Sequence, residues 1–259
     1  MTTFIQPILA NAAVYAIENA TPEGKTTCVV LLLLSLFSWT VIITKFRQLM
    51  IARRATKKFL ATYTSTRDPL DIKKRGEAFD GAPAYALYER GAEELAYQLE
   101  KNPVTVKGER RISRSSFEAV KVILEEAASA QAMSLEKGMI VLSTAVAGGP
   151  FIGLLGTVWG VMSTFAGIAA SNSASLTAMA PGVAAALVAT VTGLLVAIPA
   201  MFGYNFMVTT IRHITQELDG FATRFANQIE HAYVDNRDIE DKIAWALTRV
   251  EMGENTPAI

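Results

Sequence analysis

Residues 138–211 have the sequence GMIVLSTAVAGGPFIGLLGTVWGVMSTFAGIAASNSASLTAMAPGVAAALVATVTGLLVAIPAMFGYNFMVTTI. These 74 residues contain no Asp, Glu, Lys or Arg, which excludes an ordinary soluble domain. As one continuous helix they would measure about 111 Å, whereas one bilayer crossing needs about 30 Å. The polar, uncharged segment 171–178 therefore predicts a loop between two transmembrane helices, over residues 138–170 and 179–211. Both helices are expected to project beyond the bilayer.

A second charge-free stretch lies between Lys25 and Lys45 and predicts another transmembrane helix over residues 25–45. The expected fold is an all-α membrane protein with three transmembrane helices and long helical extensions. The single cysteine, Cys28, lies inside this first span, which excludes a disulfide framework and a cysteine-rich zinc site. His213 and His231 are isolated from other metal ligands, so no metal and no cofactor is expected.

The distribution of basic residues predicts the orientation. No acidic residue occurs between the first span and Asp68, whereas six basic residues follow the span directly: Lys45, Arg47, Arg53, Arg54, Lys57 and Lys58. Only Lys25 lies on the N-terminal side, between Glu23 and the span. Because cytoplasmic flanks carry the excess of Lys and Arg, the N-terminus is expected outside the cytoplasm and the C-terminus inside it.

The remaining segments complete the expected organisation. Residues 1–24 lack the basic start of a signal peptide. They predict a short amphipathic segment that lies on the non-cytoplasmic surface of the same membrane. Residues 46–137 predict a cytoplasmic helical domain with turns, whose basic residues can contact anionic lipid headgroups. Residues 212–259 predict a cytoplasmic C-terminal helix and tail. The charge balance of 24 basic and 24 acidic residues gives no nucleic-acid footprint.

Small residues recur every three or four positions in both later spans, which allows helices to approach closely in lipid. The sets are Gly149, Gly153, Gly156 and Gly160, and then Gly182, Ala186, Ala189, Gly193, Ala197 and Ala200. The same helices carry four hydroxyls, at Thr157, Thr164, Thr190 and Thr192. A membrane threonine commonly bonds the carbonyl four residues earlier in its own helix. The pattern alone thus leaves both simple packing and an ion pathway open.

Two long motifs in order make the chain resemble the TolQ/ExbB/MotA ion-channel family. The first is Phe151-Ile-Gly-Leu-Leu-Gly-Thr-Val-Trp-Gly-Val-Met-Ser-Thr-Phe165. The second is Ala180-Pro-Gly-Val-Ala-Ala-Ala-Leu-Val-Ala-Thr-Val-Thr-Gly-Leu-Leu-Val-Ala-Ile-Pro199, followed by Tyr204-Asn205. Three spans with a large first cytoplasmic loop are similar to the TolQ and ExbB branch, since MotA-type stators have a fourth span.

The resemblance implies a subunit of an ion-driven motor in the bacterial inner membrane, with a periplasmic N-terminus. A homopentamer would surround a dimer of a single-span ExbD- or TolR-like partner, and beyond it a TonB- or TolA-like protein is implied. In that family the threonines that match Thr157 and Thr190 line the pore. Thr164 and Thr192 extend this candidate pathway. Packing or partner contacts are expected at Gly153, Gly156, Gly160, Ala186 and Gly193.

One departure concerns the membrane carboxylate of the family. Where ExbB and TolQ have a glutamate, this chain has Ala185, so any titrating acid must come from the partner. The hydroxyl of Thr192, at a usually apolar position, adds an oxygen that a cation can use, so sodium remains an alternative to the proton.

Pro199 removes a helical hydrogen bond and is a candidate hinge, although a static bend is the favoured interpretation. No nucleophile with a partner base is recognisable, so no enzyme is predicted. Two other functions compete with the motor. A secondary transporter would call for internal repeats, which three unequal spans do not supply. A non-conducting scaffold subunit of a transport or secretion assembly would show the same glycines and stays open.

Overall fold

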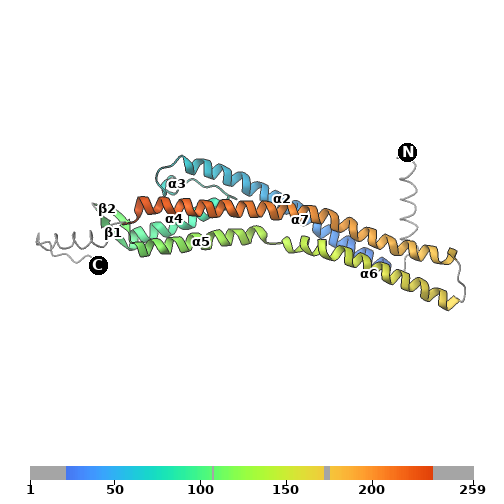
Figure 1. Cartoon of the computed structure of the whole chain (residues 1–259). Coiled ribbons are helices and arrows are strands. Elements are labelled where there is room, and N and C mark those ends of the chain that lie inside the picture. Colours follow the sequence, from blue (N-terminus) through green and yellow to red (C-terminus); the bar gives the residue numbers. More distant parts are fainter. Residues whose placement is uncertain (1–21, 107, 172–175, 236–259) are drawn as a thin grey trace, which may run out of the picture. The chain divides into compact units, whose positions relative to one another are not determined.

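The computed structural model describes residues 22–106, 108–171 and 176–235 (Figure 1). Three of its helices are long and apolar enough to cross a membrane, over Pro22–Thr64, Met139–Ala170 and Met179–Tyr233, which confirms the expected all-α membrane fold. The elements in chain order are α2 (Pro22–Thr64), α3 (Asp71–Arg75), α4 (Pro83–Lys101), β1 (Pro103–Val106), β2 (Glu109–Ile112), α5 (Arg114–Glu136), α6 (Met139–Ser171) and α7 (Leu176–Tyr233). The predicted surface segment before Pro22 and the tail beyond Asp235 lie outside the described residues, as do residues 172–175 of the predicted loop.

The chain divides into two compact units, which we name by composition. The membrane unit comprises Met1–Ile51 and Met133–His213, and the charged unit comprises Ala52–Ala132 and Ile214–Ile259. In the membrane unit many large apolar side chains are exposed, as expected for helices that face lipid tails. They include Leu32, Phe37, Phe151, Phe165, Leu195 and Phe202.

A glycine separates α5 from α6. Gly138 has φ +88°, the left-handed conformation that glycine adopts without a steric penalty. Glycine in this conformation commonly ends a helix. The helix therefore stops at Glu136 and a new one starts at Met139, close to the predicted boundary between the extramembrane domain and the second span.

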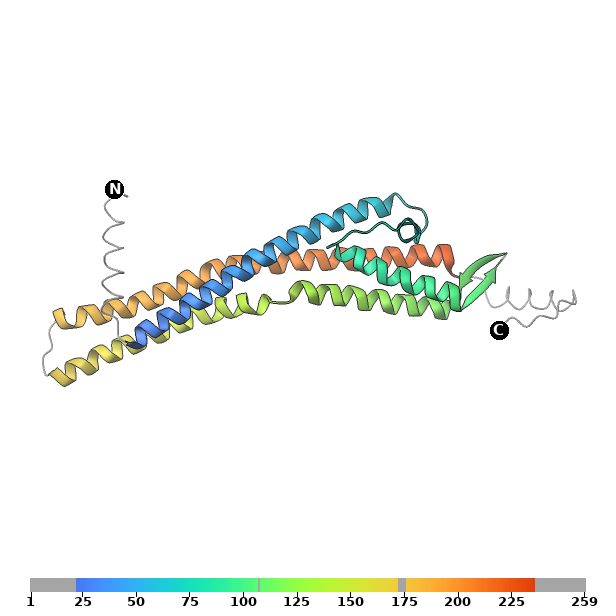
Figure 2. The ribbon, with the colours of Figure 1, turned by 180° about the vertical axis from the view of Figure 1, so that it is seen from behind.

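The charged unit has an aromatic core. Phe59 of α2 is fully buried, and its ring lies 5.4–5.9 Å from five other rings: Tyr63, Phe79, Tyr85, Tyr88 and Phe221. Gly91 of α4 fits tightly against Leu124 of α5 and Phe225 of α7. These contacts hold four helices around one centre, which the second view of the ribbon also shows (Figure 2).

A two-stranded antiparallel hairpin follows α4, where the sequence pattern predicts only helices and turns. Pro103 pairs with Ile112 and Val106 with Glu109, and Gly108 in the turn has φ +83°. The β-branched residues of Val104-Thr-Val106 favour an extended backbone over a helix. The end of α7 joins this hairpin, because Ile112 bridges Val234 in parallel and the Asp235 N–H donates to the Ile112 carbonyl at 3.0 Å.

Candidate functional site

Two threonines of neighbouring membrane helices are in direct contact. The hydroxyls of Thr157 on α6 and Thr190 on α7 are hydrogen-bonded to each other. Both also approach the carbonyl of Gly153, at 3.1 Å from Thr157 Oγ1 and 3.3 Å from Thr190 Oγ1. Each hydroxyl has one proton and two acceptor lone pairs, so this group of three oxygens retains acceptor capacity for a water or a cation. Both side chains are half-buried.

Thr164 continues the same side of α6. It lies seven residues beyond Thr157, which is about 20° around a helix of 3.6 residues per turn. Its hydroxyl donates to the Gly160 carbonyl at 2.8 Å. On α7 it faces Gly182, where the Thr164 side chain leaves no room for a methyl group. The two helices are therefore closely apposed at Thr164 as well.

The glycines of α6 lie against small residues of α7 in the same chain. A Cβ at Gly153 would lie 3.0 Å from the Ala189 carbonyl oxygen, and a Cβ at Gly160 would lie 2.8 Å from Ala186 Cβ. On α7, a Cβ at Gly193 would lie 2.5 Å from the Gly149 carbonyl oxygen. These separations are below van der Waals contact, so the predicted small residues set the spacing of α6 and α7 inside one subunit.

We call the contact between α6 and α7 the seam, and at Gly156 a third helix packs against it. A Cβ at Gly156 would lie 2.7 Å from Ala189 Cβ on α7 and 2.9 Å from Thr27 Cγ2 on α2. Further along, Gly203 of α7 faces Ile42 of α2, with a Cβ separation of 3.1 Å from Ile42 Cγ1. Thus α2 packs on one side of the α6–α7 pair.

The model of one protein family matches residues 91–220, half of the chain, and its description is MotA/TolQ/ExbB proton channel family. The chain belongs to this family. The match covers α5 and α6, the whole of the Thr157–Thr190 contact and most of α7.

Named relatives place the chain near two branches of the MotA/TolQ/ExbB family. It is 33% identical over 196 residues to the biopolymer transport protein ExbB of Pseudomonas putida, a match that covers 75% of this chain and 56% of that protein. It is 42% identical over 111 residues to ExbB of Xanthomonas campestris pv. campestris, which covers 43% of each. It is 30% identical over 201 residues to the Tol-Pal system protein TolQ of Haemophilus influenzae, which covers 76% of this chain and 84% of TolQ. The chain thus spans about half the length of the first two relatives.

Thr192 does not join the other hydroxyls of this family member. It lies 11 residues before Gly203, within about 20° of it around α7, and so on the side that Gly203 turns towards Ile42 of α2. Thr190 is about 140° from Gly203 by the same geometry. The Thr192 hydroxyl donates to its own helix, to Val188 O at 2.8 Å. The structure therefore brings Thr157, Thr164 and Thr190 to one side of the seam and leaves Thr192 on the other.

Two further predicted positions lie on α7 of this family member. Ala185 is half-buried and seven residues before Thr192, so it shares the α2-facing side. Pro199 lies inside α7, which runs from Leu176 to Tyr233 without interruption. The helix therefore accommodates the proline, and the hinge remains a prediction.

The sequence pattern does not single out one buried cation of the membrane unit. Lys45 is 8% exposed, and its Nζ donates to Leu135 O at 3.0 Å and to Gln48 Oε1 at 2.9 Å. In the sequence Lys45 is merely the first of six basic residues, and nothing distinguishes it from its exposed neighbours. Among the described residues there is no cluster of three or more His, Cys, Asp or Glu side chains suited to a metal.

Proposed function

We propose that this protein is an ExbB/TolQ-like subunit of an ion-driven motor in the bacterial inner membrane. The observation that carries the proposal is the Thr157–Thr190 hydroxyl pair, which lies on the side of the α6–α7 seam turned away from α2. Hydroxyl oxygens at membrane depth can accept bonds from water or an ion that crosses an otherwise apolar layer. If α2 lies at the periphery of a ring, this side faces the ring axis.

The proposed assembly is a homopentamer around a dimer of a single-span, ExbD- or TolR-like protein. Residues 138–211 offer no carboxylate, and Ala185 occupies the position of the family glutamate. A titrating acid at membrane depth costs about 2.5–3.5 kcal/mol and is kept only for function. In this protein the partner supplies that acid, and the threonines of the ring provide the oxygens around it.

The proposed output is rotation or mechanical work on envelope transport or maintenance, transmitted through a TonB- or TolA-like protein. The printed names of the relatives, biopolymer transport protein and Tol-Pal system protein, support this class of task. Each charge that crosses 100 mV releases about 2.3 kcal/mol, which is comparable to the repacking of a few interfacial side chains. The N-terminus is periplasmic and the charged unit cytoplasmic in this scheme.

We infer that the transported ion is the proton. A sodium ion prefers several oxygen ligands at once, and Thr192, which favoured sodium in the sequence, lies about 160° around α7 from Thr190. It cannot complete a ligand shell with the Thr157–Thr190 pair in one subunit. Replacement of sodium by potassium at fixed pH should leave transport unchanged, and loss of transport would reverse this assignment.

The test uses the full chain co-expressed with a single-span ExbD-like protein and reconstituted into vesicles. The double variant Thr157→Val and Thr190→Val should lose proton flux under an imposed potential and should still co-purify with the partner. The matched control is Thr192→Val, which removes a hydroxyl from the α2-facing side and should keep the flux. Normal flux in the double variant would assign the threonines to packing.

A non-conducting scaffold is the second candidate. It is favoured by one observation. The glycines of α6 pack against α7 of the same chain, and the hydroxyls of Thr164 and Thr192 donate to carbonyls of their own helices. A scaffold would co-purify with its partner but show no flux even in the parent protein.

A further inference from the structure

Four basic side chains of α2 in the charged unit share one outward face. Arg53, Arg54, Lys57 and Lys58 are all exposed and fall within an arc of about 140°, opposite the buried Thr56 and Phe59. None of the four has an ion-pair partner among the residues that the structure describes. We name this set the basic face of α2.

The outward face of α5 in the same unit is acidic. Glu118, Glu125 and Glu126 are exposed, and between them lies Val122, which is 61% exposed. Glu118 pairs with Lys121 at 3.0 Å, while Glu125 and Glu126 have no ion-pair partner within the described ranges. We name these three glutamates with Val122 the acidic face of α5.

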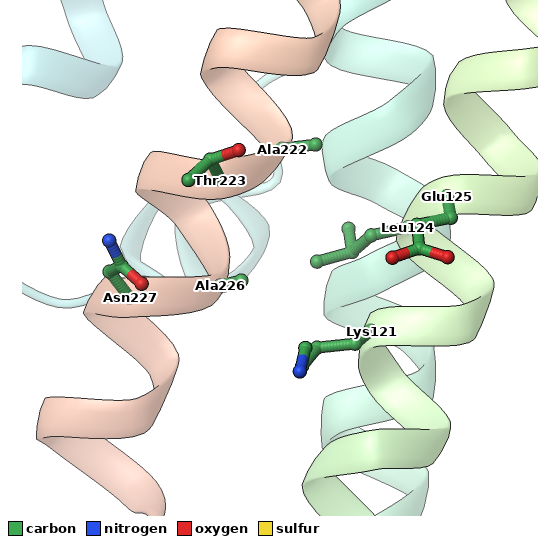
Figure 3. Close-up of a pocket in the computed structure, with 7 residues that line it drawn as sticks. All are labelled: Lys121, Leu124, Glu125, Ala222, Thr223, Ala226 and Asn227. Atoms are coloured by element: carbon green, nitrogen blue, oxygen red, sulfur yellow. The ribbon is translucent and has the colours of Figure 1, made fainter.

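A hollow adjoins the acidic face. It has a volume of about 160 Å³ and lies between α5 and α7 (Figure 3). Lys121, Leu124 and Glu125 line it from α5, and the Lys121 ammonium is paired with Glu118. On α7 the small side chains of Ala222 and Ala226 leave the space open. A long side chain of another polypeptide could enter here with a carboxylate at the rim.

The two faces point to opposite sides of the charged unit. On α7, Phe221 contacts Phe59 of α2, whereas Ala222 and Ala226 turn about 100° and 140° away to line the hollow beside α5. Both views of the ribbon place α7 between α2 and α5 (Figures 1 and 2). A face and its complement on opposite sides of one chain are suited to head-to-tail association. Such an assembly closes into a ring when the rotation that relates one copy to the next returns to the first copy after a full turn.

The faces also lie at matching heights along α7. Tyr63 of α2 is 5.9 Å from Phe225, and Leu124 of α5 meets Phe225 around Gly91. From this common level Lys58 lies five residues earlier on α2, about 7.5 Å, at 1.5 Å per residue. Glu126 lies two residues later on α5, about 3 Å, and because α5 is antiparallel to α2 this displacement has the same direction. The offset of about 4.5 Å is within reach of a lysine and a glutamate side chain. In a ring around the membrane normal, neighbouring copies share one height, so this match allows the two faces to meet.

We propose that the basic face of α2 in one copy docks on the acidic face of α5 and the adjoining hollow of the next copy. This interface rests on the proposed ring assembly and specifies how its charged units interlock. A membrane surface is the less suitable occupant, because Lys57 and Lys58 lie 12 and 13 residues beyond Lys45, about 18–20 Å along the helix. The polar layer on each side of the bilayer core is only about 5–8 Å thick.

The experiment reverses charges on each face in the full-length, detergent-purified protein and measures the assembly by native mass spectrometry. Lys57→Glu with Lys58→Glu should weaken self-association by about tenfold or more, because like charges then oppose each other. Glu125→Lys with Glu126→Lys should do the same. All four changes together should restore the assembly, since the charges are complementary again. The matched control, Lys73→Glu with Glu93→Lys, reverses exposed charges outside both faces and should not alter it.

The outcomes separate this interface from the proposed function. Assembly that persists in both double variants, or that the fourfold variant fails to restore, overturns the interface. Loss of attachment to anionic phosphatidylglycerol vesicles without a change in assembly would assign the basic face to the membrane and also overturn it. Ion flux is measured separately, so a ring that forms through these faces but conducts no ions would contradict only the motor.

Discussion

The ammonium of Lys45 on α2 donates a hydrogen bond of 3.0 Å to the backbone carbonyl of Leu135 in the last turn of α5, 90 residues further along the chain. The last carbonyls of a helix lack partners within the helix and carry partial negative charge. Lys45 Cε also lies 3.7 Å from the Cβ position of Gly138, where α5 gives way to α6. The Lys45 side chain therefore connects α2, the first membrane helix, to the point where α5 ends and α6 begins.

Lys45→Met should destabilise the membrane unit by about 1–3 kcal/mol, because a buried carbonyl loses a charged donor. The measurement is the midpoint of thermal unfolding in detergent. Arg47→Met is the control, since Arg47 is exposed and should tolerate the change. Equal midpoints for Lys45→Met and the parent would mean that the contact adds no net stability.

Gly156→Leu should prevent folding of the subunit, and hence ring assembly, because its side chain would collide with Ala189 and Thr27. Gly167→Leu, in the same helix, has no heavy atom within 4 Å of its Cβ position and should fold normally. Protease resistance and the yield of monodisperse protein distinguish the two variants. A folded Gly156→Leu protein would show that α2 and α7 can move apart at this point.

Phe59→Ala should lower the free energy of unfolding of the charged unit by about 3–5 kcal/mol, since it leaves a cavity at the centre of five surrounding rings. Tyr97→Ala serves as the control because Tyr97 is 54% exposed. Urea denaturation followed by near-ultraviolet circular dichroism measures both. A loss below about 1 kcal/mol for Phe59→Ala would mean that the rings collapse into the space.

Asp68 predicts an acid-dependent step in the stability of the charged unit. Burial raises the pKa of its carboxyl, but hydrogen bonds from Lys74, the Leu70 N–H and Tyr233 outweigh this and hold the pKa below the ordinary value of 3.8. The folded carboxyl thus stays ionised after the unfolded one is protonated. Its contribution is fully present above about pH 4 and is lost as the pH falls through the lower folded pKa.

The corresponding measurement is urea denaturation between pH 7 and pH 2.5. Asp68→Asn should remove part of the decline that the parent shows below pH 4. Tyr233→Phe deletes one donor, at 2.8 Å from Asp68 Oδ1, and should give a smaller change in the same direction. Identical pH profiles for Asp68→Asn and the parent would rule out this carboxyl as the source.

The membrane part of the fold could be predicted because hydrophobic length is a local property. The charge-free stretch 26–44 lies inside α2, and the stretch 138–211 contains α6 and the first part of α7. The β1–β2 hairpin could not be predicted in the same way, because its stability depends on the pairing of Ile112 with Val234 at the distant end of α7 as well as on local preference. Short segments with mixed propensity are decided by such tertiary contacts.

At the candidate site the division is similar. Thr157 and Thr190 could be selected by their place in two motifs, but the contact between their hydroxyls depends on how α6 rotates against α7. Thr192 shows the limit of spacing arguments, because two residues along a helix correspond to about 160° of rotation away from Thr190.

The sequence by itself determined that three helices are long and apolar enough to cross a membrane, since one crossing needs about 20 apolar residues. It also placed small residues and hydroxyls on the last two of them. Only the tertiary structure decided which small residues meet and which hydroxyls share a side of the α6–α7 pair. It also decided that the Lys45 ammonium donates to the Leu135 carbonyl. These features depend on the rotation and separation of helices, which are set by the sum of many contacts between residues far apart in the chain.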